Sequence, residues 1–210
     1  MLSHFHGDHF DQAAIQGLDK SLSIVTNEHA VEELSARGFT KFEKLDKWES
    51  VSFLKGNARL SITATPGRHG PLPVSMFMTQ VMGSVLDFQN ATEANRHLFR
   101  MYITGDTMVF DDIKDIPKRY PNVDIALFHL GGTTVMGIVV TMDAKEGLEM
   151  FKIINPKKVI PIHCNDYDVF KSPLEEFQAE VRNASLEDKV HNIRHGETYN
   201  SQIPTRKDNH

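Results

Sequence analysis

The sequence has few of the residues on which several protein classes depend. Its 210 residues include a single cysteine, Cys164, which excludes an internal disulfide and fits a reducing compartment. Its longest apolar stretches are far short of a membrane span, and its N-terminus has neither a basic region nor an apolar signal core. We therefore predict a cytoplasmic protein without a transmembrane segment.

Charge gives little indication of a partner. The formal net charge is -5, and no basic stripe runs along the chain, so a nucleic-acid groove is not indicated. The 40% hydrophobic and 24% charged residues are typical of a soluble globular domain. No linker or low-complexity segment divides the sequence. We predict one domain over residues 1–210, which ends in a polar tail at residues 200–210.

Apolar periodicity predicts an α/β fold in which helices and strands alternate. Helices are predicted at residues 10–18, 28–37, 109–120 (interrupted near Pro117), 143–154 and 173–183. Strands are predicted at residues 21–26, 39–45, 51–54, 58–65, 97–104, 123–130, 158–162 and 190–199. The methionine-rich stretch 74–88 predicts one or two further core strands, an interpretation that we favour over a substrate pocket.

Potential metal ligands are concentrated at the start of the chain. The sequence HFHGDH at residues 4–9 places four imidazole or carboxylate groups within six positions. Divalent metals such as zinc prefer these groups. If the chain is extended here, alternation puts His4 and His6 on one side, and the glycine turn directs Asp8 and His9 to a neighbouring point. The spacing indicates two metal ions rather than one.

Three further candidate ligands, His69, Asp106 and His163, each follow the end of a predicted strand. A single histidine in such a place is more often a capping or surface residue. Strand ends, however, gather side chains at one edge of a sheet. Together with the opening motif, these residues supply five histidines and two aspartates. That number suffices for two metal ions with positions left open for water and substrate.

Four motifs give the chain a resemblance to the metallo-β-lactamase fold superfamily. They are, in the order found in that family, HFHGDH at 4–9, TPGRHG at 65–70, TGDT at 104–107 and PIHCND at 161–166. The resemblance covers nearly the whole chain and implies an αββα sandwich with a dimetal site at one edge of the paired sheets. It also implies that the first metal is bound by His4, His6 and His69, the second by Asp8, His9 and His163, and both by a bridging Asp106.

The activity that this resemblance implies is hydrolysis. Two divalent metals, with zinc expected first and manganese or iron as alternatives, would hold a hydroxide that attacks a carbonyl carbon or a phosphorus. Asp8 would orient this nucleophile or pass a proton to the leaving group. The bridging Asp106 and its short interval to His163 resemble the branch of ascorbate-6-phosphate lactonase and the N-acyl-phosphatidylethanolamine phospholipase D-like enzymes. The expected substrate is a small molecule: a lactone, an amide or a phosphodiester.

The sequence departs from this family at its N-terminus. Members normally have several strands before the HFHGDH-type motif, whereas here three residues precede it. The expectation is an N-terminally truncated sandwich with an uncovered sheet edge, in which His4 and His6 lie on a poorly supported segment. A homo-oligomer or another chain could complete it. The alternative to a hydrolase is therefore an inactive or partner-dependent member that retains the metal ligands without catalysis.

Several other polar residues have a structural interpretation beside a functional one. His129 either faces the site or is a structural histidine, and we favour the second. Cys164 is expected to be a buried, inert thiol and not a ligand. His195 is expected in a loop, and helix capping accounts for Asp143. Residues 165–167 either contact substrate or form a turn, and the sequence leaves both open.

Overall fold

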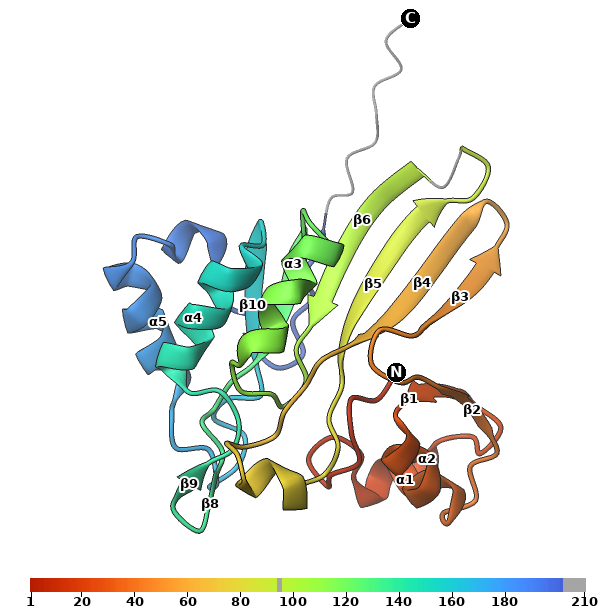
Figure 1. Ribbon diagram of the computed structural model, residues 1–210, viewed down its shortest axis with the longest axis horizontal. Helices are drawn as coiled ribbons and strands as arrows, with labels where there is room; N and C mark the ends of the chain where they lie inside the picture. The colour runs from red at the N-terminus through yellow and green to blue at the C-terminus, as the bar shows by residue number, and fades with distance from the viewer. Residues whose placement is uncertain (94–95, 202–210) are drawn as a thin grey trace, which may run out of the picture.

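The largest element of the computed structural model, which describes residues 1–93 and 96–201, is a six-stranded mixed sheet (Figure 1). Its strand order is β10-β7-β6-β5-β4-β3. The strands are β3 (Ser50–Lys55), β4 (Ala58–Thr65), β5 (Gly83–Asn90), β6 (Arg96–Ile103), β7 (Ile125–His129) and β10 (Lys158–Ile162). Neighbours from β3 to β6 are antiparallel, whereas β6, β7 and β10 are parallel. It follows that β4, β6, β7 and β10 all end at the same edge of the sheet.

A smaller sheet and several helices make up the rest of the fold. Strands β1 (Ser23–Thr26) and β2 (Lys41–Lys44) pair in parallel and are connected through α2 (Glu28–Ser35). A short antiparallel hairpin is formed by β8 (Thr134–Val135) and β9 (Ile138–Val139). The other helical elements are α1 (Gln12–Gly17), η1 (Val74–Phe77), η2 (Asp111–Asp115), α3 (Ile116–Arg119), α4 (Ala144–Ile154), α5 (Leu174–Asn183) and η3 (Glu187–Lys189).

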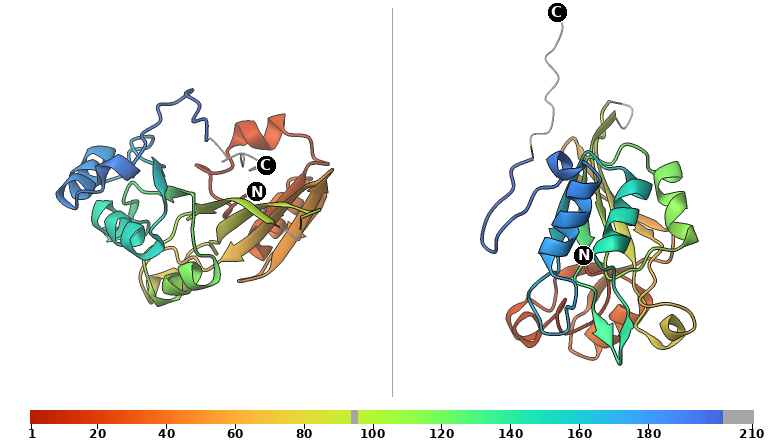
Figure 2. Two further views of the ribbon diagram at one scale, coloured as in Figure 1. Left: turned by 90° about the horizontal axis from the view of Figure 1, so that it is seen from above. Right: turned by 90° about the vertical axis from the view of Figure 1, so that its left-hand side faces the viewer.

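The layers follow the order helices, sheet, sheet, helices. On one side, α3, α4 and α5 lie together against the large sheet (Figures 1 and 2), and their apolar side chains share a buried core with those of β5, β6 and β7. On the other side, successive residues of β1 point to opposite faces. Ile24 packs with α2, and Val25 packs with residues of β4. The predicted αββα sandwich is thus confirmed.

Helix α4 shows how the sequence pattern sets these contacts. Its buried residues recur at helical spacing and face the core, and they are Ala144, Gly147, Met150, Phe151 and Ile154. Asp143 caps the helix, because its carboxylate accepts hydrogen bonds from the N–H groups of Lys145 and Glu146 at 3.0 and 2.9 Å. The predicted helix at 143–154 and the capping role of its first residue are confirmed.

Part of the predicted core strand at 74–88 is wrong. Residues 74–77 form the 3-10 helix η1, in which Met76 and Phe77 are 74% and 88% exposed, and the strand begins only at Gly83. Pro71 and Pro73, just before this stretch, have no N–H to donate to a neighbouring strand. The apolar composition of residues 74–77 therefore did not indicate burial, because this segment forms an exposed turn.

The predicted closing strand at 190–199 is also wrong. Val190 makes an isolated bridge to Val159, and the rest of this stretch forms no strand. Gly196, at φ +83°, turns the backbone out of the extended conformation. Ile193 and Tyr199 still pack against the face of the large sheet. The apolar pattern thus predicted burial correctly but not strand pairing.

Three further predictions from the sequence concern residues 109–120, the polar tail and membrane-spanning helices. The helix predicted at 109–120 is the 3-10 turn η2 followed by α3, with Pro117 in the first turn of α3, where its missing N–H is tolerated. Residues 202–210 of the predicted polar tail lie outside the described residues. Within the described part of the chain, no helix is long and apolar enough to cross a membrane.

Candidate metal centre

The opening segment is tied into the fold, contrary to the expectation of poor support. Four hydrogen bonds hold it: Leu2 N–H to Val25 O at 2.9 Å, Thr26 Oγ1 to Leu2 O at 2.8 Å, Asn27 Nδ2 to Ser3 O at 2.9 Å, and Met82 N–H to Ser3 O at 3.1 Å. The side chain of His4, which comes next, is fully buried. These bonds place the first predicted ligand beside the end of β1 and the start of β5.

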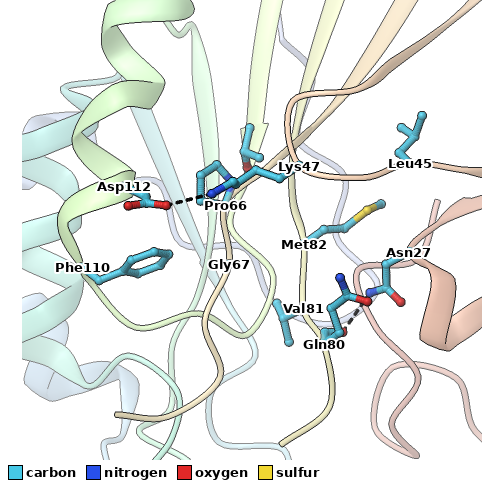
Figure 3. A pocket seen from close by; sticks show the side chains of 11 residues that line it. Asn27, Leu45, Lys47, Pro66, Gly67, Gln80, Val81, Met82, Phe110 and Asp112 are labelled. Atoms are coloured by element: carbon cyan, nitrogen blue, oxygen red, sulfur yellow. Dashed lines mark hydrogen bonds and ion pairs between the residues drawn. The ribbon is translucent and has the colours of Figure 1, made fainter. Parts of the chain in front are cut away.

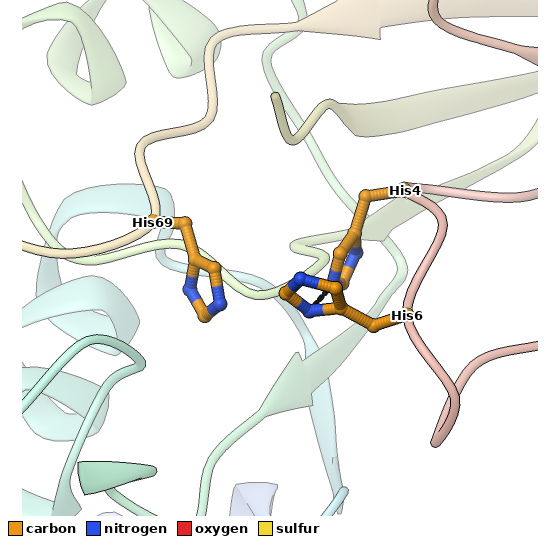
Figure 4. A group of neighbouring side chains, drawn as sticks. All are labelled: His4, His6 and His69. Carbon is orange, nitrogen blue, oxygen red and sulfur yellow. Dashed lines mark hydrogen bonds between the residues drawn. The ribbon is translucent and has the colours of Figure 1, made fainter. Parts of the chain in front are cut away.

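Three predicted ligands, His4, His6 and His69, form what we call the three-histidine group (Figure 4). His4 Nε2 lies 3.0 Å from His6 Nδ1. The ring centroid of His69 is 5.6 Å from that of His4 and 5.3 Å from that of His6. One ring nitrogen of each residue lies within 4.8 Å of the others. Three imidazole nitrogens that converge in this way have the composition of a zinc site.

The other four predicted ligands form the aspartate–histidine group, which consists of Asp8, His9, Asp106 and His163. His163 Nε2 lies 3.1 Å from an oxygen of Asp8 and 3.6 Å from an oxygen of Asp106. His9 Nε2 lies 3.2 Å from the other oxygen of Asp106. His4 Nε2, from the three-histidine group, is 3.9 Å from Asp106. The Asp106 carboxylate therefore lies between the two groups.

Backbone carbonyls orient two of the imidazoles. His69 Nδ1 lies 2.9 Å from Val140 O, and His163 Nδ1 lies 3.1 Å from Leu130 O. A carbonyl oxygen can only accept, so each Nδ1 carries a hydrogen and Nε2 is the nitrogen left to bind a metal. In the absence of a metal, His163 Nε2 donates to the Asp8 carboxylate. The Nδ1 contacts have the hydrogen-bonding pattern of metal-binding histidines, whose second nitrogen donates to a carbonyl or carboxylate.

Two buried atoms show that the residues present fit metal ions. Within the described residues, His9 Nε2 and Asp106 Oδ1 are shielded from solvent and form no hydrogen bond of acceptable geometry. Buried polar atoms are nearly always satisfied, and an unsatisfied one is destabilising. A divalent cation between these ligands would satisfy both atoms at once. The donor set is that of nitrogen and oxygen ligands suited to zinc, manganese or iron.

Burial and hydrogen bonding hold five of the seven candidate ligands in their metal-binding charge states. Burial lowers the pKa of His4 to about 2 and also lowers the pKa values of His6 and His69, so these imidazoles stay neutral. Burial opposes ionisation of Asp8, but its hydrogen bond with His163 and the charge of His9 outweigh that effect and hold its pKa at about 2. Against a similar burial effect, His9 and His163 lower the pKa of Asp106.

Two residues in the loops that follow strands, Gly105 and His163, have a left-handed backbone conformation. Gly105, before Asp106, has φ +61°, and a Cβ there would lie 2.8 Å from Met82 O. The loop can therefore pack against the chain beside it only with glycine. His163 itself has φ 60°, an uncommon conformation for a residue with a side chain. Such strained backbone is concentrated at functional sites, and here it turns the ring back toward Asp8.

A cavity of about 570 Å³ opens on the aspartate–histidine group. Its lining consists of Asp8, His9, His129, Ile162, His163, Asp166 and Tyr167. Burial lowers the pKa of His129 to about 3, so this imidazole is neutral. The cavity gives a small molecule access to Asp8, His9 and His163.

Some residues near the ligands have structural roles. Asn165 Oδ1 accepts the Leu174 N–H at 3.2 Å, which explains this residue as part of a turn. The Cys164 thiol is partly buried and donates to Ile162 O. Burial raises the pKa of that thiol to about 12, in agreement with an inert cysteine. His195 lies in a loop, as expected, with its Nε2 2.9 Å from Asp166.

A second cavity, of about 280 Å³, lies away from the ligands between the β4 end and residues 80–82 (Figure 3). Lys47 and Asp112 form an ion pair of 3.1 Å at its side. Asn27 donates to Gln80 O at 2.8 Å within it. None of the seven candidate ligands lines this cavity, so we do not assign the substrate to it.

Sequence reasoning missed the side chains that support the ligands. Thr79 Oγ1 lies 2.8 Å from His6 Nε2, and Thr141 Oγ1 lies 3.4 Å from an oxygen of Asp106. Ser3 Oγ lies 3.0 Å from His4 Nδ1. Serine and threonine occur throughout the chain, and nothing in the local pattern marks these as contacts. Only Ser3, beside the opening motif, had a position that could have suggested its role.

The comparison with protein families agrees with this geometry. Residues 1–164 match the family described as the β-lactamase superfamily domain. The chain belongs to this family. Among curated members, it is 27% identical over 190 residues to a UPF0173 metal-dependent hydrolase of Staphylococcus saprophyticus, covering 86% of this chain and 74% of that protein. It is 24% identical over 209 residues to one of Rubrobacter xylanophilus, covering 96% and 78%.

Solved structures of the β-lactamase superfamily fold superimpose on most of the chain. An isothiocyanate hydrolase from Delia radicum gut bacteria has a TM-score of 0.78 at 21% identity, covering 96% of this chain and 75% of its own. Igni18, a metallo hydrolase of Ignicoccus hospitalis, has a TM-score of 0.70 at 23% identity, covering 94% and 76%. At these identities the likeness shows the fold that the chain shares with them.

Proposed function

We propose that this chain is a dinuclear metal-dependent hydrolase of small molecules. Its family and its relatives make it a metal-dependent hydrolase of the β-lactamase fold. The observation that supports two metals is the position of Asp106, whose oxygens lie 3.2 Å from His9 Nε2 and 3.9 Å from His4 Nε2. One carboxylate thus reaches toward both groups, as a bridging ligand would.

Each group would hold one ion. The three-histidine group would bind the first, the side chains of Asp8, His9 and His163 would bind the second, and Asp106 would bind both. Bound divalent metals lower the pKa of water and stabilise negative charge on a substrate oxygen. Asp8 lines the cavity and is ionised, so it can accept a proton from the attacking water or return one to the leaving group.

We propose a lactone, an amide or a phosphodiester as the substrate class. Each has a carbonyl or phosphoryl centre that a water-derived nucleophile can attack. The cavity of about 570 Å³ has the size of a small-molecule site. Within the superfamily, we propose the branch of ascorbate-6-phosphate lactonase and the N-acyl-phosphatidylethanolamine phospholipase D-like enzymes, on the interval between Asp106 and His163. Zinc is the first metal to test, followed by manganese and iron.

Metal analysis with a substrate panel tests this function. We expect about two metal ions per wild-type chain by plasma mass spectrometry, and hydrolysis of a γ-lactone, an N-acyl amide or bis(p-nitrophenyl) phosphate. Asp106→Ala and His6→Ala should lose metal and lower kcat/KM by at least about 100-fold, more than the loss of a supporting residue. His191→Gln, at an exposed histidine outside the site, is the matched control.

Other outcomes of these experiments would distinguish the hydrolase from the alternative, a member that retains the ligands without catalysis. Folded protein that binds no metal after zinc is supplied would contradict the proposal. Protein that binds two metals but hydrolyses none of the panel would favour that alternative. Equal activity in Asp106→Ala and the wild type would exclude a bridging role for Asp106.

A further inference from the structure

His129 is a histidine in the cavity wall that neither ligand group includes. It ends β7, between β6, which leads to Asp106, and β10, which leads to His163. Its ring centroid lies 5.6 Å from the ring centroids of both His9 and His163. Only 8% of the residue is exposed, and it lines the cavity that opens on the aspartate–histidine group. A substrate in that cavity would contact this ring.

Thr104 fixes which ring nitrogen of His129 carries the hydrogen. Thr104 Oγ1 accepts the backbone N–H of His129 at 2.9 Å and lies 3.3 Å from its Nδ1. If the hydroxyl donates to Nδ1, the Thr104 hydroxyl hydrogen and the His129 backbone N–H both have partners, and the ring hydrogen lies on Nε2, which is not shielded from solvent. If Nδ1 donated instead, the hydroxyl hydrogen of the fully buried Thr104 would have no acceptor among the described residues. The first arrangement is favoured, because an unmade buried hydrogen bond is costly.

The hydrogen of the His129 imidazole is therefore on Nε2. Within the described residues, Nε2 has no hydrogen-bond partner of its own, although it is not among the atoms shielded from solvent. A neutral imidazole with a free Nε2–H is a donor and not a metal ligand. It is also rigid, since its backbone N–H and its Nδ1 are both held by Thr104.

We propose that His129 is a catalytic residue, which donates its Nε2–H to the carbonyl or phosphoryl oxygen of the substrate as negative charge develops there. This inference rests on the proposed hydrolase function. Thr104 is a positioning residue, which acts through the tautomer of His129. A preorganised donor of this kind contributes more to the transition state than to substrate binding. This role requires an oxygen on the attacked atom, which a lactone, an amide and a phosphodiester all have.

The tautomer can be measured without any substrate. In zinc-loaded protein labelled with 15N-histidine, we expect the His129 ring to be neutral with its hydrogen on Nε2, assigned by loss of these signals in His129→Gln. In Thr104→Val the preference for one tautomer should disappear. A hydrogen on Nδ1 in the wild type would overturn the proposal, whether or not the protein hydrolyses the panel.

Kinetics with matched variants test the donor itself. His129→Phe should lower kcat by about 10²- to 10³-fold, the effect of removing one oxyanion donor, while KM changes little. His129→Gln, whose amide N–H can replace Nε2–H, should recover most of this loss. His191→Gln serves as the control, and metal content should remain at the wild-type level in all three.

The results distinguish this proposal from the one on which it rests. A wild type that hydrolyses the panel, with equal kcat in His129→Phe and unchanged metal content, would overturn the role of His129 alone. A His129→Phe variant that loses metal would show a structural role instead.

If the wild type hydrolyses none of the panel, binding of inorganic phosphate, measured by calorimetry, tests the donor. Affinity at least about tenfold weaker in His129→Phe, as expected for a lost hydrogen bond to a charged group, supports the donor, and equal affinity overturns it.

Discussion

Burial decides the charge of single histidines in this protein. The pKa of His4 is lowered to about 2 and that of His129 to about 3, in both cases mainly because burial disfavours the charged ring. His163 behaves differently: burial opposes its protonation, but its hydrogen bond to Asp8 and the charge of Asp106 raise its pKa. The site therefore combines imidazoles that stay neutral with one that attracts a proton.

These shifts predict that the metal-free protein loses stability as pH falls below about 6.5, the ordinary histidine value. A histidine with a lowered folded pKa binds its proton first in the unfolded chain, so acid favours unfolding down to the folded value. His4 and His129 should each contribute a loss of about 1.4 kcal/mol per pH unit in this range. His163 has the opposite sign, but its contribution is complete below about 6.5 and does not compensate there.

Urea unfolding of chelator-treated protein between pH 7 and 5 checks this prediction. Fluorescence of Trp48, the single tryptophan, reports the transition. The slope should be smaller in His129→Phe, which removes one of the titrating rings, and unchanged in His191→Gln. A free energy of unfolding that stays constant from pH 7 to 5 would show that these rings are not held neutral.

The residues of the site differed in how far the sequence could predict them. His69, Asp106 and His163 could be predicted because β4, β6 and β10 run in one direction and end at the same edge. Their ligand roles remain proposals, but the structure does bring them together. Thr79 and Thr104 could not be predicted: Thr79 contacts His6 across two segments far apart in the sequence, and Thr104 contacts His129 only because β6 and β7 pair. His129 was interpreted as structural, since a strand pattern does not show which way its last side chain points.

At the scale of elements, Asn27 joins three segments that support the three-histidine group. Its side chain accepts the Ala30 N–H at 2.9 Å as the N-cap of α2 and donates to Ser3 O and Gln80 O. Ser3 precedes His4, and Gln80 follows Thr79, whose hydroxyl contacts His6. One buried amide therefore links a helix end to both segments around these ligands.

Two substitutions of Asn27 should separate its role as a helix cap from its role as a hydrogen-bond donor to Ser3 and Gln80. Asn27→Ser keeps a capping oxygen but loses both donated hydrogen bonds, and we expect a loss of about 1–3 kcal/mol in the free energy of unfolding. Asn27→Ala should lose roughly 1 kcal/mol more, because the cap is lost as well. Both should weaken zinc binding, measured by competition with a chromogenic chelator.

A second helix cap provides the comparison for this prediction. Asp143→Ser exchanges the N-cap of α4 for another good capping residue and leaves the hydrogen bonds to Ser3 and Gln80 in place. It should change stability by less than about 0.5 kcal/mol and leave zinc affinity as in the wild type. If Asn27→Ser behaved like Asp143→Ser, the bonds to Ser3 and Gln80 would have no part in holding the site.

At the scale of the whole molecule, the candidate ligands connect the two halves of the sandwich. Residues 4–9 precede the small sheet, whereas His69, Asp106 and His163 follow strands of the large sheet. The layer order was predicted from the resemblance of four motifs to the metallo-β-lactamase superfamily, whereas apolar periodicity predicted only the alternation of helices and strands. The sequence could not predict that the opening segment is held by β1 and by residue 82, because those hydrogen bonds join backbone groups that carry no sequence signal.

Because the ligands span both sheets, metal binding should stabilise the fold as a whole. Free zinc at 100 times its dissociation constant would add about 2.7 kcal/mol, provided that it binds only the folded state. For a chain of this size, the melting temperature should then rise by about 5–10 °C. The rise in melting temperature should depend on zinc concentration, and a chelator should reverse it.

A variant with both His69→Ala and Asp106→Ala should show no rise. His97→Ala, at the opposite end of β6 from Asp106, should respond like the wild type. A zinc-dependent rise that persists in the double variant would place the stabilising ion somewhere other than between the two sheets.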